Sequence, residues 1–268
     1  MSAVHARVEG LEARNLVMRF GGLVAVDGMS LQAPRGRLTG LIGPNGAGKT
    51  TTFNMCSGLA RPTSGTVLFD GSDVTHEPPH ARALRGLGRT FQRMELFDSL
   101  TVRENLDLGR EAGLAGGSPW RLVVSRPRDA ADIRRRTERA AEVCGIVDLL
   151  DRVPADLSTG QRRLVELARV VAGEFSVLLL DEPSSGLDGR ETTEFGAILR
   201  RLIVERSLGI LLVEHDMALV MSVCDYLYVL DFGRPIFEGT PAEVAASDVV
   251  RAAYLGADGA ADALEVLA

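Results

Sequence analysis

The sequence predicts an α/β fold in which a core with parallel strands carries an antiparallel β subdomain and an inserted α-helical subdomain. Two wholly apolar runs, 177–180 and 210–213, stand between segments of helical periodicity, as expected of parallel strands buried on both faces. Short β-rich runs separated by turn residues precede them. Between these regions lies an Arg- and Glu-rich stretch with helical periodicity, which favours a helical insertion.

The N-terminal part is predicted to form a partly antiparallel sheet. The runs 16–20 and 38–42 are each bounded by glycine or polar turn residues, which is typical of short strands. A third run, 66–69, enters an Asp70-Gly71 pair, and this dipeptide tolerates the positive φ angles that tight turns demand. An antiparallel arrangement is therefore expected here.

The helical pattern of the inserted subdomain extends over about residues 101–155, and glycines and prolines between Gly113 and Pro127 interrupt it. After the parallel core resumes, we expect a closing hairpin at 226–238 and a helix whose first turn contains Pro241. The expected organisation is a core with an antiparallel β subdomain at 11–97 and 156–240, a helical insertion at 98–155, and a C-terminal helix with a frayed, flexible tail at 241–268.

Composition excludes several classes of protein. A chain of 268 residues with 46% hydrophobic content can bury a sizeable core, which rules out a disordered or fibrous chain. Its apolar runs fall far short of the roughly 20 residues that span a bilayer, and the N-terminus shows no signal-peptide pattern. The three cysteines are widely spaced and have no Cys-x-x-Cys or nearby His pairs, which argues against disulfides and zinc. A cytoplasmic protein is expected.

Nucleic acid is not an expected partner. The formal net charge of −6 gives no overall attraction to a polyanion. The arginine-rich stretch 121–139 is interleaved with acidic residues and has no accompanying aromatic platform. We therefore interpret it as a solvated helix face.

The sharpest local signal is a glycine-rich loop directly after the run 38–42. Residues 43–50 fit the pattern G-x-x-x-x-G-K-[ST] of a phosphate-binding loop between a strand and a helix. In such a loop backbone N–H groups converge on the phosphates, Lys49 supplies a compact charge to the β and γ phosphates, and Thr50 can ligate magnesium. Lys49 is the single lysine beside 29 arginines, which favours a need for a point-like ammonium at this position. The loop predicts a bound nucleoside triphosphate.

Two further segments fit the chemistry of phosphoryl transfer. The run 177–180 ends in Asp181 and Glu182, at the edge of an α/β sheet where ligands bind. We expect Asp181 to hold magnesium and Glu182 to polarise the attacking water. Ser158 can cap the helix predicted to follow it, and a helix N-terminus favours anions. Taken alone, this last feature is an ordinary capped helix.

Together these segments resemble the ATP-binding subunit of an ABC transporter. The likeness covers about residues 11–256 and implies the P-loop NTPase core of the ABC ATPase type. Thr159 departs from the glycine of the commonest signature. The motifs occur in the family's order: the Walker A loop (43–51), the Q-loop glutamine (Gln92), an LSGGQ-like signature (157–161), Walker B with its glutamate (Asp181, Glu182), the D-loop (185–188) and the switch histidine (His215).

The resemblance implies a role for each motif. Gln92 joins Thr50 and Asp181 at Mg²⁺, while Glu182 and His215 orient the water at the γ phosphate. Phe20 stacks on adenine, although an aromatic residue on a strand is also often part of a core. Residues implied at the chain's own ATP are Phe20, Val26, Gly43, Pro44, Asn45, Gly46, Ala47, Gly48, Lys49, Thr50 and Thr51. Those implied at the ATP of a second chain are Ser158, Thr159, Gly160 and Gln161, and Asp188 belongs to the D-loop.

A finer resemblance points to the ATPases of branched-chain amino acid importers. Residues 70–71, 78–80, 89–92, 214–217 and 253–256 are similar to that subgroup, whereas its common Ala- and Asn-containing D-loop is replaced by one with Ser184, Ser185 and Asp188. The subgroup implies an ATPase on the inner face of the cell membrane that energises import of a small polar solute. Its implied partners are a second ATPase subunit, identical or related, transmembrane permease subunits and, indirectly, a substrate-binding protein. Urea, amide or other amino acid import, lipopolysaccharide-type export and a soluble non-transport ABC ATPase remain open.

Overall fold

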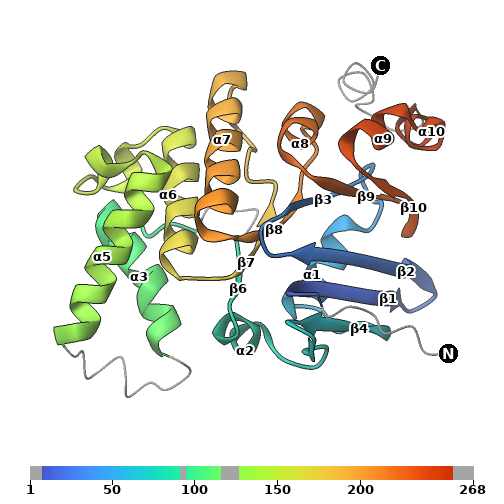
Figure 1. Ribbon diagram of the computed structural model, residues 1–268, viewed down its shortest axis with the longest axis horizontal. Helices are drawn as coiled ribbons and strands as arrows, with labels where there is room; N and C mark the ends of the chain where they lie inside the picture. Colours follow the sequence, from blue (N-terminus) through green and yellow to red (C-terminus); the bar gives the residue numbers. More distant parts are fainter. Residues whose placement is uncertain (1–7, 91–94, 116–126, 256–268) are drawn as a thin grey trace.

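The computed structural model describes residues 8–90, 95–115 and 127–255 as two packed β-sheets with helices around them (Figure 1). A six-stranded sheet has the strand order β10-β9-β3-β8-β7-β6, and a four-stranded sheet has the order β2-β1-β4-β5. Helix α1 contacts strands of both sheets, while α7 and α8 lie on the other side of the larger sheet. This arrangement confirms the predicted α/β fold class with its antiparallel β subdomain and helical lobe.

The larger sheet is parallel except for its last hairpin. Every residue of β3, β7 and β8 is buried, as the apolar runs of β7 and β8 predict. Alternate residues of β7 enter two different cores, because Leu178 and Leu180 face the helices whereas Leu179 faces α1 and the smaller sheet. The strands are β3 (Leu38–Ile42), β6 (Leu87–Arg89), β7 (Val177–Asp181), β8 (Gly209–Val213), β9 (Tyr226–Asp231) and β10 (Arg234–Gly239).

All strand pairs of the smaller sheet are antiparallel, as predicted. The expectation that the run 38–42 belongs to this sheet is wrong, because as β3 it pairs in parallel with β8 and β9 of the larger sheet. The first strand of the smaller sheet begins at Gly10 rather than at residue 16, because a bulge with Asn15 at φ 47° interrupts the alternation of buried and exposed residues. The sequence patterns do not predict where β2 and β5 begin or end. Asp70 and Gly71 have φ angles of 49° and 74°, so the tight turn is formed as expected. The strands are β1 (Gly10–Phe20), β2 (Leu23–Pro34), β4 (Ser64–Phe69) and β5 (Ser72–Asp73).

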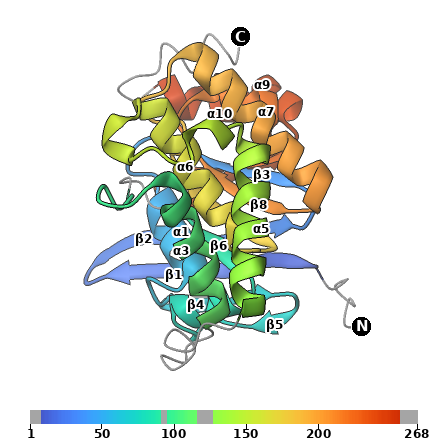
Figure 2. The same cartoon turned by 90° about the vertical axis from the view of Figure 1, so that its left-hand side faces the viewer.

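Three helices pack against one another in the helical lobe (Figure 2). The helix that follows Ser158, α6, contacts both other helices of the lobe and contributes Val165 and Ala168 to the same core as β7. It therefore connects the lobe to the larger sheet. The elements are α3 (Val102–Ala115), α5 (Pro127–Cys144), two 3₁₀ turns (Val147–Leu149 and Pro154–Asp156) and α6 (Thr159–Ala172).

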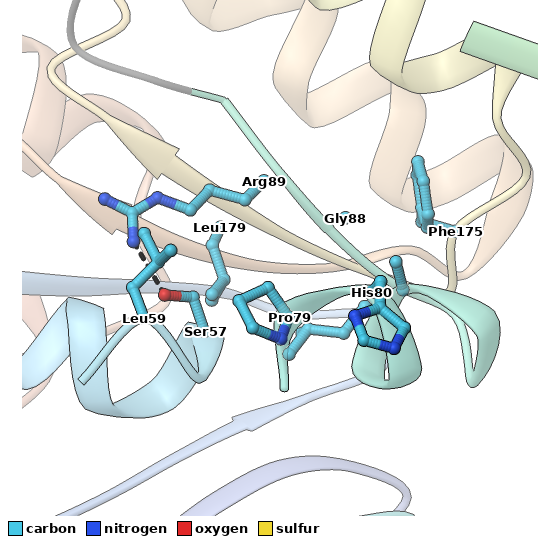
Figure 3. Close-up of a pocket in the computed structure, with 10 residues that line it drawn as sticks. Ser57, Leu59, Pro79, His80, Gly88, Arg89, Phe175 and Leu179 are labelled. Carbon is cyan, nitrogen blue, oxygen red and sulfur yellow. Dashed lines mark hydrogen bonds between the residues drawn. The ribbon is translucent and has the colours of Figure 1, made fainter. Parts of the chain in front are cut away.

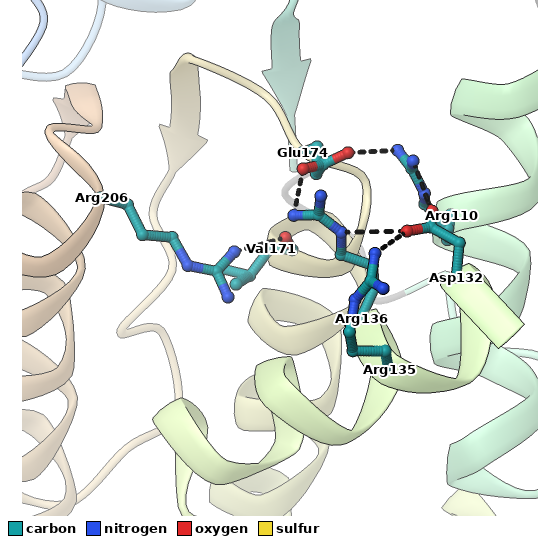
Figure 4. Close-up of polar contacts among 7 residues, drawn as sticks. All are labelled: Arg110, Asp132, Arg135, Arg136, Val171, Glu174 and Arg206. Atoms are coloured by element: carbon teal, nitrogen blue, oxygen red, sulfur yellow. Dashed lines mark hydrogen bonds and ion pairs between the residues drawn. The ribbon is translucent and has the colours of Figure 1, made fainter.

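Ion pairs between arginines and carboxylates also join the lobe's helices (Figure 4). Arg110 of α3 lies 2.6 Å from the Asp132 carboxylate of α5 and 2.8 Å from that of Glu174, which follows α6. Arg136 of α5 pairs with the same Glu174. Arg139 contacts the Glu142 carboxylate at 3.2 Å. Described arginines of the stretch 121–139 thus face carboxylates of their own chain.

The remaining helices pack against one or both of the two sheets. The helix predicted at Pro241 begins there, behind a capping box made by Thr240 and Glu243. A second helix follows it as far as Leu255, and the predicted frayed tail lies outside the described residues. Among the described helices, none has the length and apolar content to cross a membrane. These helices are α1 (Lys49–Ser57), α2 (Pro79–Leu84), α7 (Gly189–Arg206), α8 (Met217–Val223), α9 (Pro241–Ala246) and α10 (Asp248–Leu255).

Candidate nucleotide-binding site

A pocket of about 490 Å³ opens beside the carboxyl ends of β3 and β7. Ligands of α/β sheets bind at this edge, where the connections that follow parallel strands meet. Its other walls come from the start of β2 and from the β9–β10 turn. The lining residues are Leu23, Val24, Ala25, Asn45, Gly46, Ala47, Gly48, Lys49, Thr50, Thr51, Glu182, Phe232 and Gly233.

The loop between β3 and α1 has a conformation that only glycine permits at two positions. Gly43 has a φ of 147°, and a Cβ atom there would lie 2.0 Å from the Leu230 carbonyl oxygen. Gly48 has a φ of 101°, and its Cβ atom would lie 2.7 Å from the Ala25 carbonyl oxygen. Because Gly48 is the N-cap and offers no side-chain cap, the first N–H groups of α1 are available to an anion.

The side chain of Lys49 folds back and binds the backbone of this loop. Its side chain is buried, and Nζ donates to the carbonyl oxygens of Gly43 at 2.5 Å and Pro44 at 2.9 Å. Burial lowers the pKa of the ammonium, whereas the nearby Glu182 and Asp181 carboxylates raise it. The single lysine of the chain is thus held at the pocket, with acidic groups close by.

Asp181 and Glu182 stand at the end of β7, but in different surroundings. Asp181 is 3% exposed, and Arg89 Nη2 donates to its Oδ2 at 3.3 Å. Burial raises the pKa of the Asp181 carboxyl, and the Arg89 charge opposes this rise. Glu182 lines the pocket and has a φ of 47°, with its backbone N–H bonded to the Val213 carbonyl at 2.8 Å. A non-glycine residue in this conformation is strained, as often found at functional sites.

His215 follows β8 and lies beside Glu182. Its Nδ1 is 3.9 Å from Glu182 Oε2 and 3.7 Å from Glu214 Oε2, and its side chain is 61% exposed. The Glu214 carboxylate, which is buried, also accepts the His215 backbone N–H at 3.1 Å. The fold therefore brings together a histidine and a glutamate that the sequence separates.

The signature segment forms the capped helix expected of Ser158. Gln161 N donates to Ser158 Oγ at 3.2 Å, and Ser158 N donates to Gln161 Oε1 at 3.1 Å, which makes a capping box. Asp188 caps α7 in the same way with Glu191. The two helix starts are in contact, since a Cβ atom on Gly160 would lie 2.3 Å from Glu191 Oε1. Thr159, like the other signature residues, is not among the described residues that line the chain's own pocket.

Three further expected residues, Phe20, Val26 and Gln92, are not among the described residues that line the pocket. Phe20 is 55% exposed at the end of β1, paired with Leu23 of the pocket wall, so it is not a core residue. Val26 is fully buried, and a Cβ atom on Gly48 would lie 3.3 Å from its Cγ2, so it supports the loop from behind. Gln92 lies outside the described residues.

The sequence does not predict two contacts of the phosphate-binding loop. Gly233 N donates to the Ala47 carbonyl at 3.0 Å, which brings the exposed side chain of Phe232 to the pocket rim. Tyr254 of α10 is buried, which raises the pKa of its hydroxyl, while the nearby Gly43 backbone N–H acts to lower this pKa. The turn at 232–235 is visible in the sequence, but nothing local indicates what it touches.

Comparison with known proteins identifies the family. A sequence profile described as ABC transporter matches residues 26–185, more than half of the chain. A second profile, described as branched-chain amino acid ATP-binding cassette transporter, matches residues 234–260.

Similar proteins include both import and export components. The high-affinity branched-chain amino acid transport ATP-binding protein BraF of Pseudomonas aeruginosa is 38% identical over 249 residues, which covers 92% of this chain and 97% of BraF. Its counterpart LivG of Escherichia coli K12 is 38% identical over 248 residues, with 92% and 97% covered. The lipopolysaccharide export system ATP-binding protein LptB of Escherichia coli K12 is 35% identical over 251 residues, with 92% and 98% covered.

Solved structures agree with these relatives. The ADP conformation of MJ1267, an ATP-binding cassette of an ABC transporter, superimposes with a TM-score of 0.81 at 30% identity, covering 93% of this chain and 99% of that one. The structure of cbiO1 from Clostridium perfringens, part of the ABC transporter complex cbiONQ, gives 0.78 at 31% identity, with 91% and 94% covered. With its phosphate-binding loop, paired carboxylates and cassette fold, the chain belongs to the ABC transporter family, as an ATP-binding and ATP-hydrolysing subunit.

Proposed function

We propose that this protein energises the import of branched-chain amino acids, or of closely related amino acids, by hydrolysing ATP at the pocket beside β3 and β7. The observation that carries this proposal is the match of residues 234–260 to the branched-chain profile. The relatives agree, since two branched-chain transport proteins are 38% identical and the lipopolysaccharide export protein is 35% identical.

The subgroup-specific segment is connected to the nucleotide site. It includes β10, α9 and α10, whose buried residues Val244 and Val250 join the main core. Within it, the buried Tyr254 hydroxyl lies near enough to the Gly43 backbone N–H for this group to affect its pKa. The segment that supports the proposed solute class therefore also lies against the phosphate-binding loop.

The proposed roles around ATP follow from charge and position. The first turn of α1 and the Lys49 ammonium receive the phosphates, and Phe20 stacks on the base from the end of β1. Among the described residues, no three His, Cys, Asp or Glu gather as a metal-binding group. The Thr50 hydroxyl and the Asp181 carboxylate are hard oxygen donors, which suit a Mg²⁺ ion whose shell is completed by phosphates. With Gln92 as a further proposed ligand, Mg²⁺ at this place supplies charge compensation for the phosphates.

Hydrolysis is assigned to Glu182 and His215. The Glu182 carboxylate lines the pocket and can accept a proton from, or orient, a water molecule beside the phosphates. His215, 3.9 Å from it, can donate a hydrogen bond to the γ phosphate while staying next to the same water. Gln92 is proposed to complete this catalytic group.

The proposed assembly contains a second ATPase subunit, either identical or related. Ser158 to Gln161 present a helix N-terminus away from the lining of their own pocket, and we assign it to the ATP of the second subunit. Separate permease subunits provide the membrane passage, and a substrate-binding protein delivers the solute to them. The protein then acts at the inner face of the cell membrane.

Uptake in the source organism tests the proposed solute. Deleting the gene is expected to abolish high-affinity uptake of radiolabelled leucine, and restoring the wild-type gene is expected to recover it. The matched control is Glu182→Gln, which keeps the fold and restores no uptake. Normal leucine uptake in the deletion strain, with loss of urea or amide uptake or a defect in lipopolysaccharide export, would refute the proposed substrate class.

A further inference from the structure

Strand β6 ends with an arginine whose backbone is held in register with the strand that carries Asp181. Arg89 is paired with Leu179 of β7. The next residue strengthens this connection, because Thr90 N donates to the Leu179 carbonyl at 2.9 Å and Asp181 N donates to Thr90 Oγ1 at 3.3 Å. The position of Arg89 relative to Asp181 is therefore fixed by the sheet.

The Arg89 guanidinium connects Asp181 to helix α1. Nη1 donates to Ser57 Oγ at 2.6 Å and to Asn54 Oδ1 at 2.8 Å, and Nη2 donates to Asp181 Oδ2 at 3.3 Å. Figure 3 shows the bond to Ser57 at the wall of an apolar pocket of about 250 Å³. Because α1 begins at Lys49, one side chain joins the helix of the phosphate-binding lysine to the carboxylate at the end of β7.

The contact distances indicate which end of this connection is the anchor. The two bonds to α1 are short, and the guanidinium also lies 4.7 Å from the centre of the Phe53 ring of the same helix. The contact with Asp181 is longer, at 3.3 Å, so α1 is the anchor of the guanidinium. From this anchor the guanidinium restricts the position of the Asp181 carboxylate. A rigid fork with several N–H donors can bridge these groups at once, whereas a lysine ammonium is a single point.

A second buried arginine nearby provides a contrast. Arg82 is 1% exposed, and it donates to the carbonyl oxygens of Glu77, Met55, Cys56 and Thr75. All of these acceptors belong to the backbone, so Arg82 stabilises the end of α1. Arg89 also bonds to α1, but unlike Arg82 it contacts the carboxylate of Asp181 as well.

We propose that Arg89 is a positioning residue for the divalent cation. Anchored on α1, it holds the Asp181 carboxylate in a fixed relation to the phosphate-binding loop, so that cation and phosphates are received in one geometry. Groups that orient a metal-ligating carboxylate through hydrogen bonds affect metal affinity without touching the metal. The inference rests on the proposed role of Asp181 as a cation ligand.

Nucleotide titrations with and without the cation test this proposal. The probe is a fluorescent, non-hydrolysable ATP analogue, and its affinity is measured in excess Mg²⁺ and in EDTA. In Arg89→Lys the affinity in EDTA is expected to stay within about twofold of wild type, while the gain caused by Mg²⁺ falls roughly 10- to 100-fold. Ser57→Ala, which removes one anchor without changing any charge, is expected to reduce the gain in the same direction by less.

Three controls separate the possible outcomes. Arg82→Lys is expected to lower the melting temperature and leave the Mg²⁺ gain unchanged, whereas Lys49→Ala loses binding in both conditions. Asp181→Asn is expected to lose the Mg²⁺ gain, and if it keeps the gain, the proposed role of Asp181 fails. If Asp181→Asn loses the gain but a folded Arg89→Lys keeps it, only the inference about Arg89 is overturned. If Arg89→Lys does not fold, an unchanged gain in Ser57→Ala overturns it.

Discussion

Glu214 Oε1 accepts two hydrogen bonds from Ser184, one from the backbone N–H at 2.8 Å and one from the hydroxyl at 2.7 Å. Both residues are buried, Glu214 directly after β8 and Ser184 shortly after β7. The contact lies behind Glu182 and His215 and joins the two strand ends that carry them. The Ser184 hydroxyl adds a second bond to the same carboxylate oxygen as the backbone N–H.

Replacing this hydroxyl is expected to reduce stability. Ser184→Ala leaves the backbone bond to Glu214 and removes the other, and a hydrogen bond to a charged group contributes about 1.5–3 kcal/mol. We expect the free energy of unfolding to fall by an amount in this range, as measured by urea denaturation. Ser185→Ala is the matched control and is expected to cost less. Equal losses in the two variants would contradict the assigned contribution of the Ser184 hydroxyl.

Removing the charge of Glu182 is expected to separate binding from hydrolysis. Glu182→Gln keeps the size of the side chain but cannot accept a proton, so hydrolysis should slow by roughly 10²- to 10⁴-fold. Binding of ATP should persist, because Lys49 and the loop are unchanged. Single-turnover hydrolysis and equilibrium binding measure the two effects. Turnover at the wild-type rate would show that another group orients the water.

Association of two chains is expected to depend on ATP. The Glu182→Gln variant should form a dimer when ATP is added, because the signature helix of each chain can then meet the phosphates of the other. Light scattering with and without ATP measures the change in mass. Adding Ser158→Arg should block the dimer and leave ATP binding intact, whereas Ala197→Arg, on the exposed side of α7, should not. Loss of ATP binding in the Ser158→Arg variant would mean that the signature does not act between chains.

The turn at the rim of the pocket should become more stable with asparagine. Phe232 and Gly233 have φ angles of 43° and 79°, a pair that favours asparagine before glycine. Phe232 is 87% exposed, so its removal costs little packing. We expect Phe232→Asn to raise the free energy of unfolding by about 0.5–1 kcal/mol, as commonly found when a residue is made compatible with its backbone. Gly233→Ala should have the opposite sign, since its Cβ atom would lie 2.7 Å from the Ala25 carbonyl. A lower stability of Phe232→Asn would be incompatible with this explanation.

Buried thiols are expected to make stability fall in alkali. Burial raises the pKa of Cys56 and of Cys144 from 9.0 to about 12. Above pH 9 the unfolded chain releases these protons and the folded chain keeps them, so the free energy of unfolding decreases as pH rises from about 9 toward 12. Each thiol contributes a slope of up to ~1.4 kcal/mol per pH unit. Urea denaturation at pH 8, 9 and 10 measures it, and Cys56→Ala with Cys144→Ala should make the decline shallower. The buried Cys224 thiol, whose pKa is also raised, keeps its own contribution in this variant. The same slope in this variant and in wild type would exclude the Cys56 and Cys144 thiols as its cause.

Much of the candidate site and of the larger sheet could be predicted from the sequence, because these features depend on neighbouring residues along the chain. The loop at 43–50, the carboxylates at 181 and 182 and the cap at Ser158 are contiguous patterns whose function depends on neighbours along the chain. Apolar runs likewise predicted β7 and β8, because strands buried on both faces need no alternation. The bulge at Asn15 had the opposite effect, since one extra residue breaks the period of two on which strand prediction depends.

Tertiary structure alone decided which distant groups meet at the pocket. Arg89 and Asp181 are 92 positions apart, and their contact exists because β6 pairs with β7 at the edge of the larger sheet. The Gly233 bond to Ala47 requires β9 to lie beside β3, and Tyr254 reaches Gly43 only through the packing of α10. Strand order follows from the joint burial of all apolar faces rather than from any single segment. The sequence therefore determined which groups carry the chemistry, and the packing of sheets and helices determined which partners hold them in place.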